Sequence, residues 1–195
     1  LESNTSGTEN TAVGHYALGN NTIGVDNNAF GRDALYQNIS GNYNVAFGSA
    51  VLASNQTGSS NVGLGYAALN SNISGNYNTA VGRGALYAAT GNNNIALGLQ
   101  AGQALTSGSN NIIIGFDIAA PLDTGSNQLN IGNLIFGTGI DGADKIISSG
   151  NIGIGATAPF SRFQVAGLPP QTSTSSLVLL GSTFITGGNA AGTFI

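Results

Sequence analysis

The chain has 195 residues, the length of one domain or one elongated unit, and only 6 % of them are charged, against about 25 % in an average globular domain. Four Lys and Arg against eight Asp and Glu give a net charge of −4, which offers no basic stripe for phosphates, so we expect no nucleic-acid partner. Cys is absent and His occurs once, which excludes disulfides and Cys-ligated metals and argues against a His-based triad or metal site.

The composition also indicates a cellular location. No run of about 18 apolar residues is present, so we expect no membrane insertion. Because the chain starts at Leu1 and contains no Met, we expect it to be a piece of a longer protein. A surface of Asn, Ser, Thr and Gly suits an extracellular fibre better than a cytosolic monomer, and we expect no cofactor.

Residues 1–136 consist of a repeat. Glycines that follow an apolar residue recur every 17 residues with one interval of 16, and a second glycine column has the same intervals. This shared exception indicates the deletion of one residue between Gly82 and Gly91. The first column consists of Gly14, Gly31, Gly48, Gly65, Gly82, Gly98, Gly115 and Gly132. The second consists of Gly7, Gly24, Gly41, Gly58, Gly75, Gly91, Gly108 and Gly125.

An asparagine opens each unit, and Gln128 takes its place in the eighth. The unit reads N-x-A-φ-G-x-x-A-L-x-x-N-x-x-G-x-x, where φ is apolar. The opening residues are Asn10, Asn27, Asn44, Asn61, Asn78, Asn94 and Asn111.

The period selects the fold class. Helical repeats need about 33 to 47 residues, whereas 17 residues hold one coil of a β-solenoid or β-roll, which we expect to contain two short strands and two turns. The asparagine column predicts a ladder in which each side-chain amide bonds the amides above and below. The glycine columns predict turns with positive φ or close approach between coils. The sequence thus predicts an all-β solenoid of about eight 17-residue coils over residues 1–136.

Each coil offers only two or three inward apolar side chains, many of them Ala, so one solenoid alone has a thin core. Association of several chains around an axis would bury either the Ala-Leu pair or the φ column of each coil. We expect a homotrimer, because closed cyclic symmetry suits a repeating shaft.

The segments Asn44-Val-Ala-Phe-Gly48, Asn78-Thr-Ala-Val-Gly82 and Asn94-Ile-Ala-Leu-Gly98 resemble the N-x-A-[IV]-G core of head repeats in trimeric autotransporter adhesins. The longer unit is similar to repeats of bacterial surface fibres and phage tail-fibre proteins. The resemblance covers about residues 7–136 and implies a trimeric fibre, although the period of 17 departs from the usual 14 of the autotransporters.

The repeat degrades after Gly132, and we expect residues 137–168 to form a capping or transition β segment. Within it, Gly150-Asn-Ile-Gly-Ile-Gly155 and the following residues resemble a segment that follows the repeats in such fibre proteins. Residues 169–195 predict a linker and a β-strand tail that is truncated or docks on a neighbour.

Tyrosines recur near the expected coil corners and are the predicted glycan or receptor contacts, the alternative being lateral packing between chains. They are Tyr36, Tyr43, Tyr66, Tyr77 and Tyr87. Three triplets that start at Asn38, Asn55 and Asn72 match glycosylation sequons, but they fall in one repeat column, which already accounts for them.

Charged residues predict no catalytic or metal site. Arg32-Asp33 predicts a surface ion pair, and His15 predicts a solvated corner. Asp141 and Asp144 lack a known Ca²⁺-loop pattern, and the acids Asp117 and Asp123 are expected in a loop.

The sequence therefore predicts a non-enzymatic structural and adhesive fibre segment, the shaft or head of a phage tail fibre or bacterial surface appendage, presenting host- or surface-binding sites. Two alternatives stay open: a subunit of a polymerising extracellular filament, and a polysaccharide-binding or polysaccharide-degrading tail spike, which would need paired carboxylates.

Overall fold

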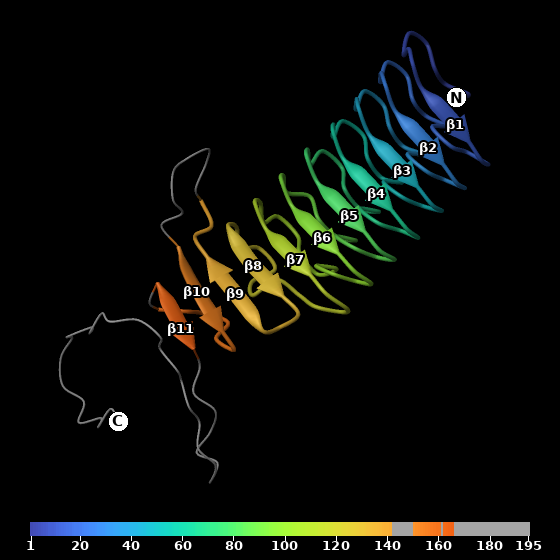
Figure 1. Ribbon diagram of the computed structural model, residues 1–195. Coiled ribbons are helices and arrows are strands. Elements are labelled where there is room, and N and C mark those ends of the chain that lie inside the picture. The colour runs from blue at the N-terminus through green and yellow to red at the C-terminus, as the bar shows by residue number, and fades with distance from the viewer. Residues whose placement is uncertain (142–149, 161, 166–195) are drawn as a thin grey trace, which may run out of the picture.

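A computed structural model describes residues 1–141, 150–160 and 162–165 (Figure 1). These residues form one sheet of eleven strands in chain order, and they contain no helix. The predicted all-β solenoid fold is confirmed. The strands are β1 (Thr11–Val13), β2 (Asn28–Phe30), β3 (Val45–Phe47), β4 (Val62–Leu64), β5 (Thr79–Val81), β6 (Ile95–Leu97), β7 (Ile112–Ile114), β8 (Gln128–Ile131), β9 (Ile135–Thr138), β10 (Asn151–Ile154) and β11 (Phe163–Val165).

Strands β1 to β8 are parallel, and each pairs with the strand of the next coil in the register that the repeat predicts. The stack contains about seven full turns. Strand β8 begins an eighth, but the chain reverses after Ile131 and β9 returns antiparallel to β8. Strand β10 lies antiparallel to β9, and β11 lies parallel to β10. The predicted linker and tail at 169–195 lie outside the described residues.

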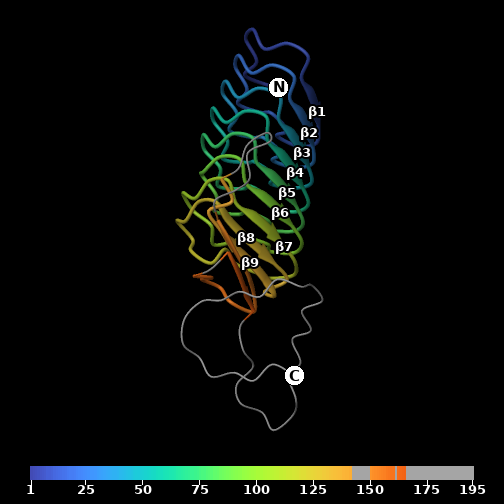
Figure 2. The ribbon, with the colours of Figure 1, turned by 60° about the vertical axis from the view of Figure 1, so that its left-hand side comes forward.

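Each coil contains one strand rather than the two we expected. The rest of the coil is a series of turns, and Figure 2 shows the strands in a row along one side of the stack. The cause is visible in the third coil, where Ala50, Leu52 and Ser60 have φ of 57°, 50° and 58°. Val51 and Leu52 are adjacent and both buried, which a strand does not allow because its side chains alternate between faces.

The core is a narrow column inside the turns. The middle residue of each of β2 to β7 is buried, as Ala46 is, and in the first five coils an Ala-Leu pair, or Val51-Leu52 in the third, closes the interior from the other side. Leu52 is fully buried, so its packing offsets the cost of its left-handed conformation. The Ala-Leu pair is therefore buried within the chain itself.

The opening asparagines form a ladder in the interior. The Asn44 Nδ2 amide donates to Asn27 Oδ1 at 3.1 Å and to the Gly58 carbonyl at 2.8 Å. Asn44 Oδ1 accepts from the backbone N–H of Asn61 at 3.0 Å and from its Nδ2 at 3.1 Å. Each amide of this ladder forms hydrogen bonds with its neighbours in the coils above and below, and these bonds permit its burial.

A second buried ladder, which the sequence analysis did not identify, runs beside the first. It starts at the exposed Asn4, and its buried members are Asn21, Asn38, Asn55 and Asn72. The Asn55 Nδ2 amide donates to Asn38 Oδ1 at 2.8 Å, and Asn55 Oδ1 accepts from Asn72 Nδ2 at 2.9 Å. The ladder ends at Asn72, whose Oδ1 is buried without a partner, because Ala89 occupies the equivalent place in the next coil.

The glycine columns permit close stacking. At Gly65, with φ of 116°, a Cβ would lie 2.9 Å from the Gly82 carbonyl oxygen and 2.8 Å from its carbon. At Gly132, where the chain reverses, a Cβ would meet nothing within 4 Å. At Gly65, glycine is therefore required both by the close approach of the neighbouring coil and by the positive φ of the turn. At Gly132 it is required by the positive φ alone.

Candidate functional site

The outer face of the sheet carries a row of partly exposed apolar side chains, one from each coil. The first and third residues of β1 to β7, and the second and fourth of β8, lie on the outer side of the sheet, so the φ column lies on this sheet face and not in the core. Its members are Val13, Phe30, Phe47, Leu64, Val81, Leu97, Ile114 and Ile131. Phe47 is 55 % exposed, and its ring stacks on Phe30 with 4.9 Å between centroids. No outward residue of β1 to β8 is charged. Of the two candidates for an interface between chains, only the φ column remains available.

The structure does not gather the five predicted contact tyrosines into one site. Tyr36 and Tyr87 occupy one repeat column, Tyr43 and Tyr77 another, and Tyr66 a third. Their environments differ accordingly: a Cβ at Gly19 would lie 3.0 Å from the ring of Tyr36, so that ring covers the preceding coil.

Tyr66 is also engaged within the chain. The Arg83 guanidinium lies 5.8 Å from the centroid of the Tyr66 ring, a distance typical of a cation–π contact.

Tyr43 and Tyr77 belong to the column that precedes each opening asparagine, which we call the left-handed edge. Every member has φ between 55° and 60°: Glu9, Asp26, Tyr43, Ser60, Tyr77, Asn93, Asn110 and Asn127. This conformation suits Gly, Asn and Asp and is costly for a bulky residue. Tyr43 and Tyr77 are nevertheless 61 % and 64 % exposed.

The two ends of the left-handed edge differ in chemistry. At the N-terminal end, a side-chain hydrogen bond to Asp26 and the charge of Asp26 raise the pKa of Glu9. At the other end the exposed amides form a chain in which Asn93 Nδ2 donates to Asn110 Oδ1 at 3.1 Å, and Asn110 Nδ2 donates to Asn127 Oδ1 at 3.0 Å.

Two shallow depressions run along the stack. One of about 480 Å³ follows the left-handed edge and the adjoining strand residues, and is lined by Asn93, Ile95, Asn110, Ile112, Asn127 and Ile140, together with Asp141. The other, of about 530 Å³, is lined by Ser3, Asn20, Thr22, Gln37, Ile39 and Gln56. Both are open to solvent, and apart from Asp141 their linings are amides, hydroxyls and branched apolar side chains.

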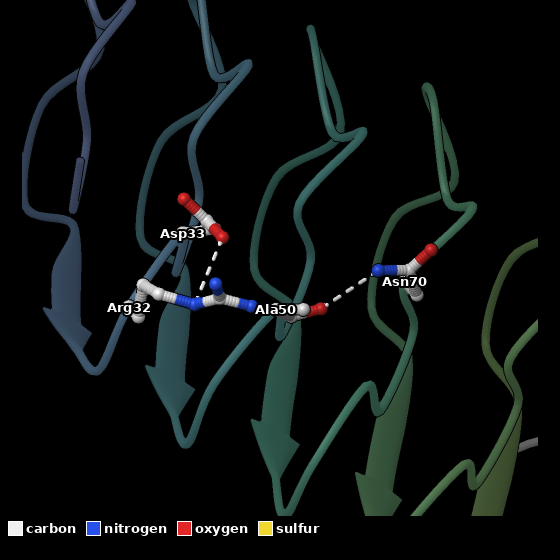
Figure 3. Close-up of polar contacts among 4 residues, drawn as sticks. All are labelled: Arg32, Asp33, Ala50 and Asn70. Carbon is white, nitrogen blue, oxygen red and sulfur yellow. Dashed lines mark hydrogen bonds and ion pairs between the residues drawn. The ribbon is translucent and has the colours of Figure 1, made fainter. Parts of the chain in front are cut away.

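The remaining polar candidates lie as follows. The predicted ion pair forms, with Arg32 Nε 3.3 Å from Asp33 Oδ2 on the exposed turn (Figure 3). In the same view the Asn70 amide donates to the Ala50 carbonyl at 2.9 Å, which ties two coils together. His15 lies against Tyr16, with ring centroids 3.9 Å apart.

The sequon asparagines Asn38, Asn55 and Asn72 are fully buried in the second ladder. Their amides are not accessible in the folded chain, so the repeat does account for these triplets.

Glu9 and Asp26 form a pair of neighbouring carboxyl groups, but in the part of the chain that the structure describes no group of three His, Asp or Glu side chains has the arrangement of a metal site. Asp144, one of the two acids considered for Ca²⁺, lies outside the described residues. No helix among the described residues is long and apolar enough to cross a membrane.

Comparison with protein-family models, with curated proteins and with solved structures finds no match for this chain. The described residues offer a continuous stack, an apolar sheet face without charges and a left-handed edge with exposed aromatic side chains.

Proposed function

We propose that this chain is a structural and adhesive segment of an extracellular fibre, the shaft or head of a phage tail fibre or of a bacterial surface appendage. In this proposal it is not an enzyme: it acts by stiffness and by presenting host- or surface-binding sites in several copies. The observation that carries the proposal is the uninterrupted stack, in which backbone pairing and an interior ladder continue from coil to coil.

The uncharged sheet face supports a homotrimer as the assembled form. An exposed apolar strip that recurs in every coil is typical of an interaction surface rather than of a small-molecule pocket. Only a partner with the same repeat spacing presents an apolar side chain at each step, and a second copy of this chain does so. Three copies around an axis would bury the strip and bring three copies of every outer surface together, which raises avidity.

Light scattering on the purified chain at several concentrations tests the proposal. We expect a stable species of three times the chain mass of 19.4 kDa. Phe47→Asp places a carboxylate on the sheet face and should yield a folded monomer, because the Phe47 side chain is already half exposed in one chain. Ile23→Asp is the matched control: Ile23 is 53 % exposed but lies off the sheet face, so the trimer should persist.

A wild-type monomer at every concentration, or a Phe47→Asp variant of unchanged mass, would contradict the trimer. Very large rod-like particles would favour the polymerising filament instead.

A further inference from the structure

We propose that Tyr43 and Tyr77, with Ser60 between them, form a binding site for a neutral oligosaccharide on the left-handed edge. The inference builds on the proposed adhesive function and identifies its contact residues and ligand class. It selects two of the five candidate tyrosines by their conformation.

The backbone conformation of Tyr43 and Tyr77 is unfavourable for a large side chain. Tyr43 and Tyr77 have φ of 59° and 58°, where a bulky side chain is disfavoured, and the other members of this edge show that smaller residues fit the same place. The buried leucines also adopt positive φ, but their burial in the core compensates for it. Neither tyrosine has that compensation, because both side chains point to solvent.

The side chains of Tyr43 and Tyr77 have no hydrogen-bond or ring partner among the described residues. Within the described residues, the only hydrogen bonds of Tyr43 and Tyr77 are those of their backbones, such as the Tyr43 N–H to the Val25 carbonyl at 3.0 Å. Neither ring contacts another aromatic ring or an Arg side chain there. A strained, exposed aromatic side chain without a partner in its own chain points to a partner outside it.

Spacing and charge define the ligand. The two tyrosines occupy the same position two coils apart, roughly 10 Å at a strand spacing of about 4.8 Å, and the small Ser60 between them leaves the space open. Two aromatic side chains at this spacing suit the apolar faces of alternate sugar rings in one chain, while the phenol, Ser60 and Asn93 side chains supply hydrogen-bonding groups for hydroxyls. The nearby carboxylates Glu9 and Asp26 disfavour an anionic chain.

Substitution by asparagine separates binding from folding. Asn is the natural occupant of this edge at three coils, so Tyr43→Asn with Tyr77→Asn removes both rings and relieves the backbone. We expect the melting temperature of the double variant to rise by at least about 2 °C. Affinity for the sugar should fall at least tenfold.

The probes are neutral hexasaccharides of glucose and of N-acetylglucosamine, titrated by isothermal calorimetry, which measures the affinity of the wild type and of the double variant without depending on the two tyrosine side chains that the variant removes. A screen on an array of neutral oligosaccharides precedes the titration. Phe116→Asn removes another highly exposed aromatic side chain, 74 % accessible and off this edge, and should leave affinity unchanged.

Three results would overturn the site. The wild-type chain binds none of the neutral sugars; the double variant binds as well as the wild type; or the double variant has a different mass in solution, which would assign these tyrosines to contacts between chains. The mass of the wild-type chain reports separately on the fibre proposal, so failure of the trimer and failure of the sugar site are distinguishable.

Discussion

At the scale of single residues, the stack depends on buried amides whose hydrogen bonds are shared between coils. An amide in the middle of a ladder both donates and accepts, whereas one at the end lacks a neighbour on one side. The two cases occur in one ladder, at Asn55 and Asn72, which makes their energetic difference measurable.

We expect Asn55→Ala to lower the free energy of unfolding by about 3 kcal/mol, because it leaves Asn38 Oδ1 without a donor and one N–H of Asn72 without an acceptor. Asn72→Ala should cost less, about 2 kcal/mol: it also leaves Asn55 Oδ1 without a donor, but the Asn72 oxygen that it removes is already unpaired, so no N–H of the next coil loses its acceptor. Urea denaturation measures both, with exposed Asn20→Ala as the control. Equal losses for the two ladder positions would contradict this account.

The carboxyl pair on the left-handed edge predicts a pH dependence. The hydrogen bond to Asp26 and its negative charge raise the pKa of Glu9 above the reference value of 4.5. The protonated form of Glu9 is therefore favoured by folding, so its stabilisation is complete below pH 4.5 and is lost as pH rises through the raised folded-state pKa.

Glu9→Gln should remove this part of the pH dependence and raise the melting temperature at neutral pH relative to the wild type. Melting curves from pH 3 to pH 8 test it, with Glu2→Gln as the control for an exposed acid outside the pair. Parallel pH profiles for the wild type and Glu9→Gln would show that the pair is not coupled.

At the scale of the coil, the closest contacts are those between backbones. Gly65→Ala would drive a Cβ against the Gly82 carbonyl group, which cannot yield without opening the stack, and we expect a loss of about 3 kcal/mol or more. Gly132→Ala meets no neighbour and should cost about 1–2 kcal/mol for its left-handed φ of 59° alone. Denaturation of both variants checks the ranking; a larger loss at Gly132 would reverse it.

The period and the glycine columns were sufficient to predict the fold class and the parallel register, because only a short coil accommodates a 17-residue unit. They did not predict one strand per coil. The signal was present in the adjacent Ala and Leu, such as Ala34 and Leu35, since two neighbouring inward residues are incompatible with the alternation of a strand.

The second ladder was missed for a related reason. Its asparagines recur in only the first part of the repeat, and Ser or Thr two residues later made them look like sequons. The proposed tyrosine site could not be selected from the sequence for a different reason: the repeat columns separate Tyr43 and Tyr77 from the other three tyrosines, but only the structure shows that their column has a left-handed backbone.

At the scale of the whole molecule, each coil contacts only its neighbours, so unfolding should spread along the stack rather than occur everywhere at once. All six tyrosines lie between Tyr16 and Tyr87, so tyrosine emission reports on the N-terminal coils, whereas circular dichroism reports on the entire sheet.

We expect Gly65→Ala to shift the urea midpoint seen by tyrosine emission further than the midpoint seen by circular dichroism. Ile113→Ala, in the interior of β7, should shift the midpoint seen by circular dichroism further than the midpoint seen by tyrosine emission. Coincident midpoints for both probes in both variants would show that the stack unfolds as one cooperative unit.

The shortened fifth coil has a genetic consequence. One residue is missing in the turn between Ala89 and Gly91, yet Thr79 still pairs with Ile95 and the parallel register continues. The deletion of one residue within a turn thus leaves the strand register unchanged. Duplication or loss of a whole repeat unit in the gene would instead move all later coils by one strand spacing, about 4.8 Å. The reach of such a rod can evolve by copy number, in equal steps, while each interface between coils keeps its chemistry.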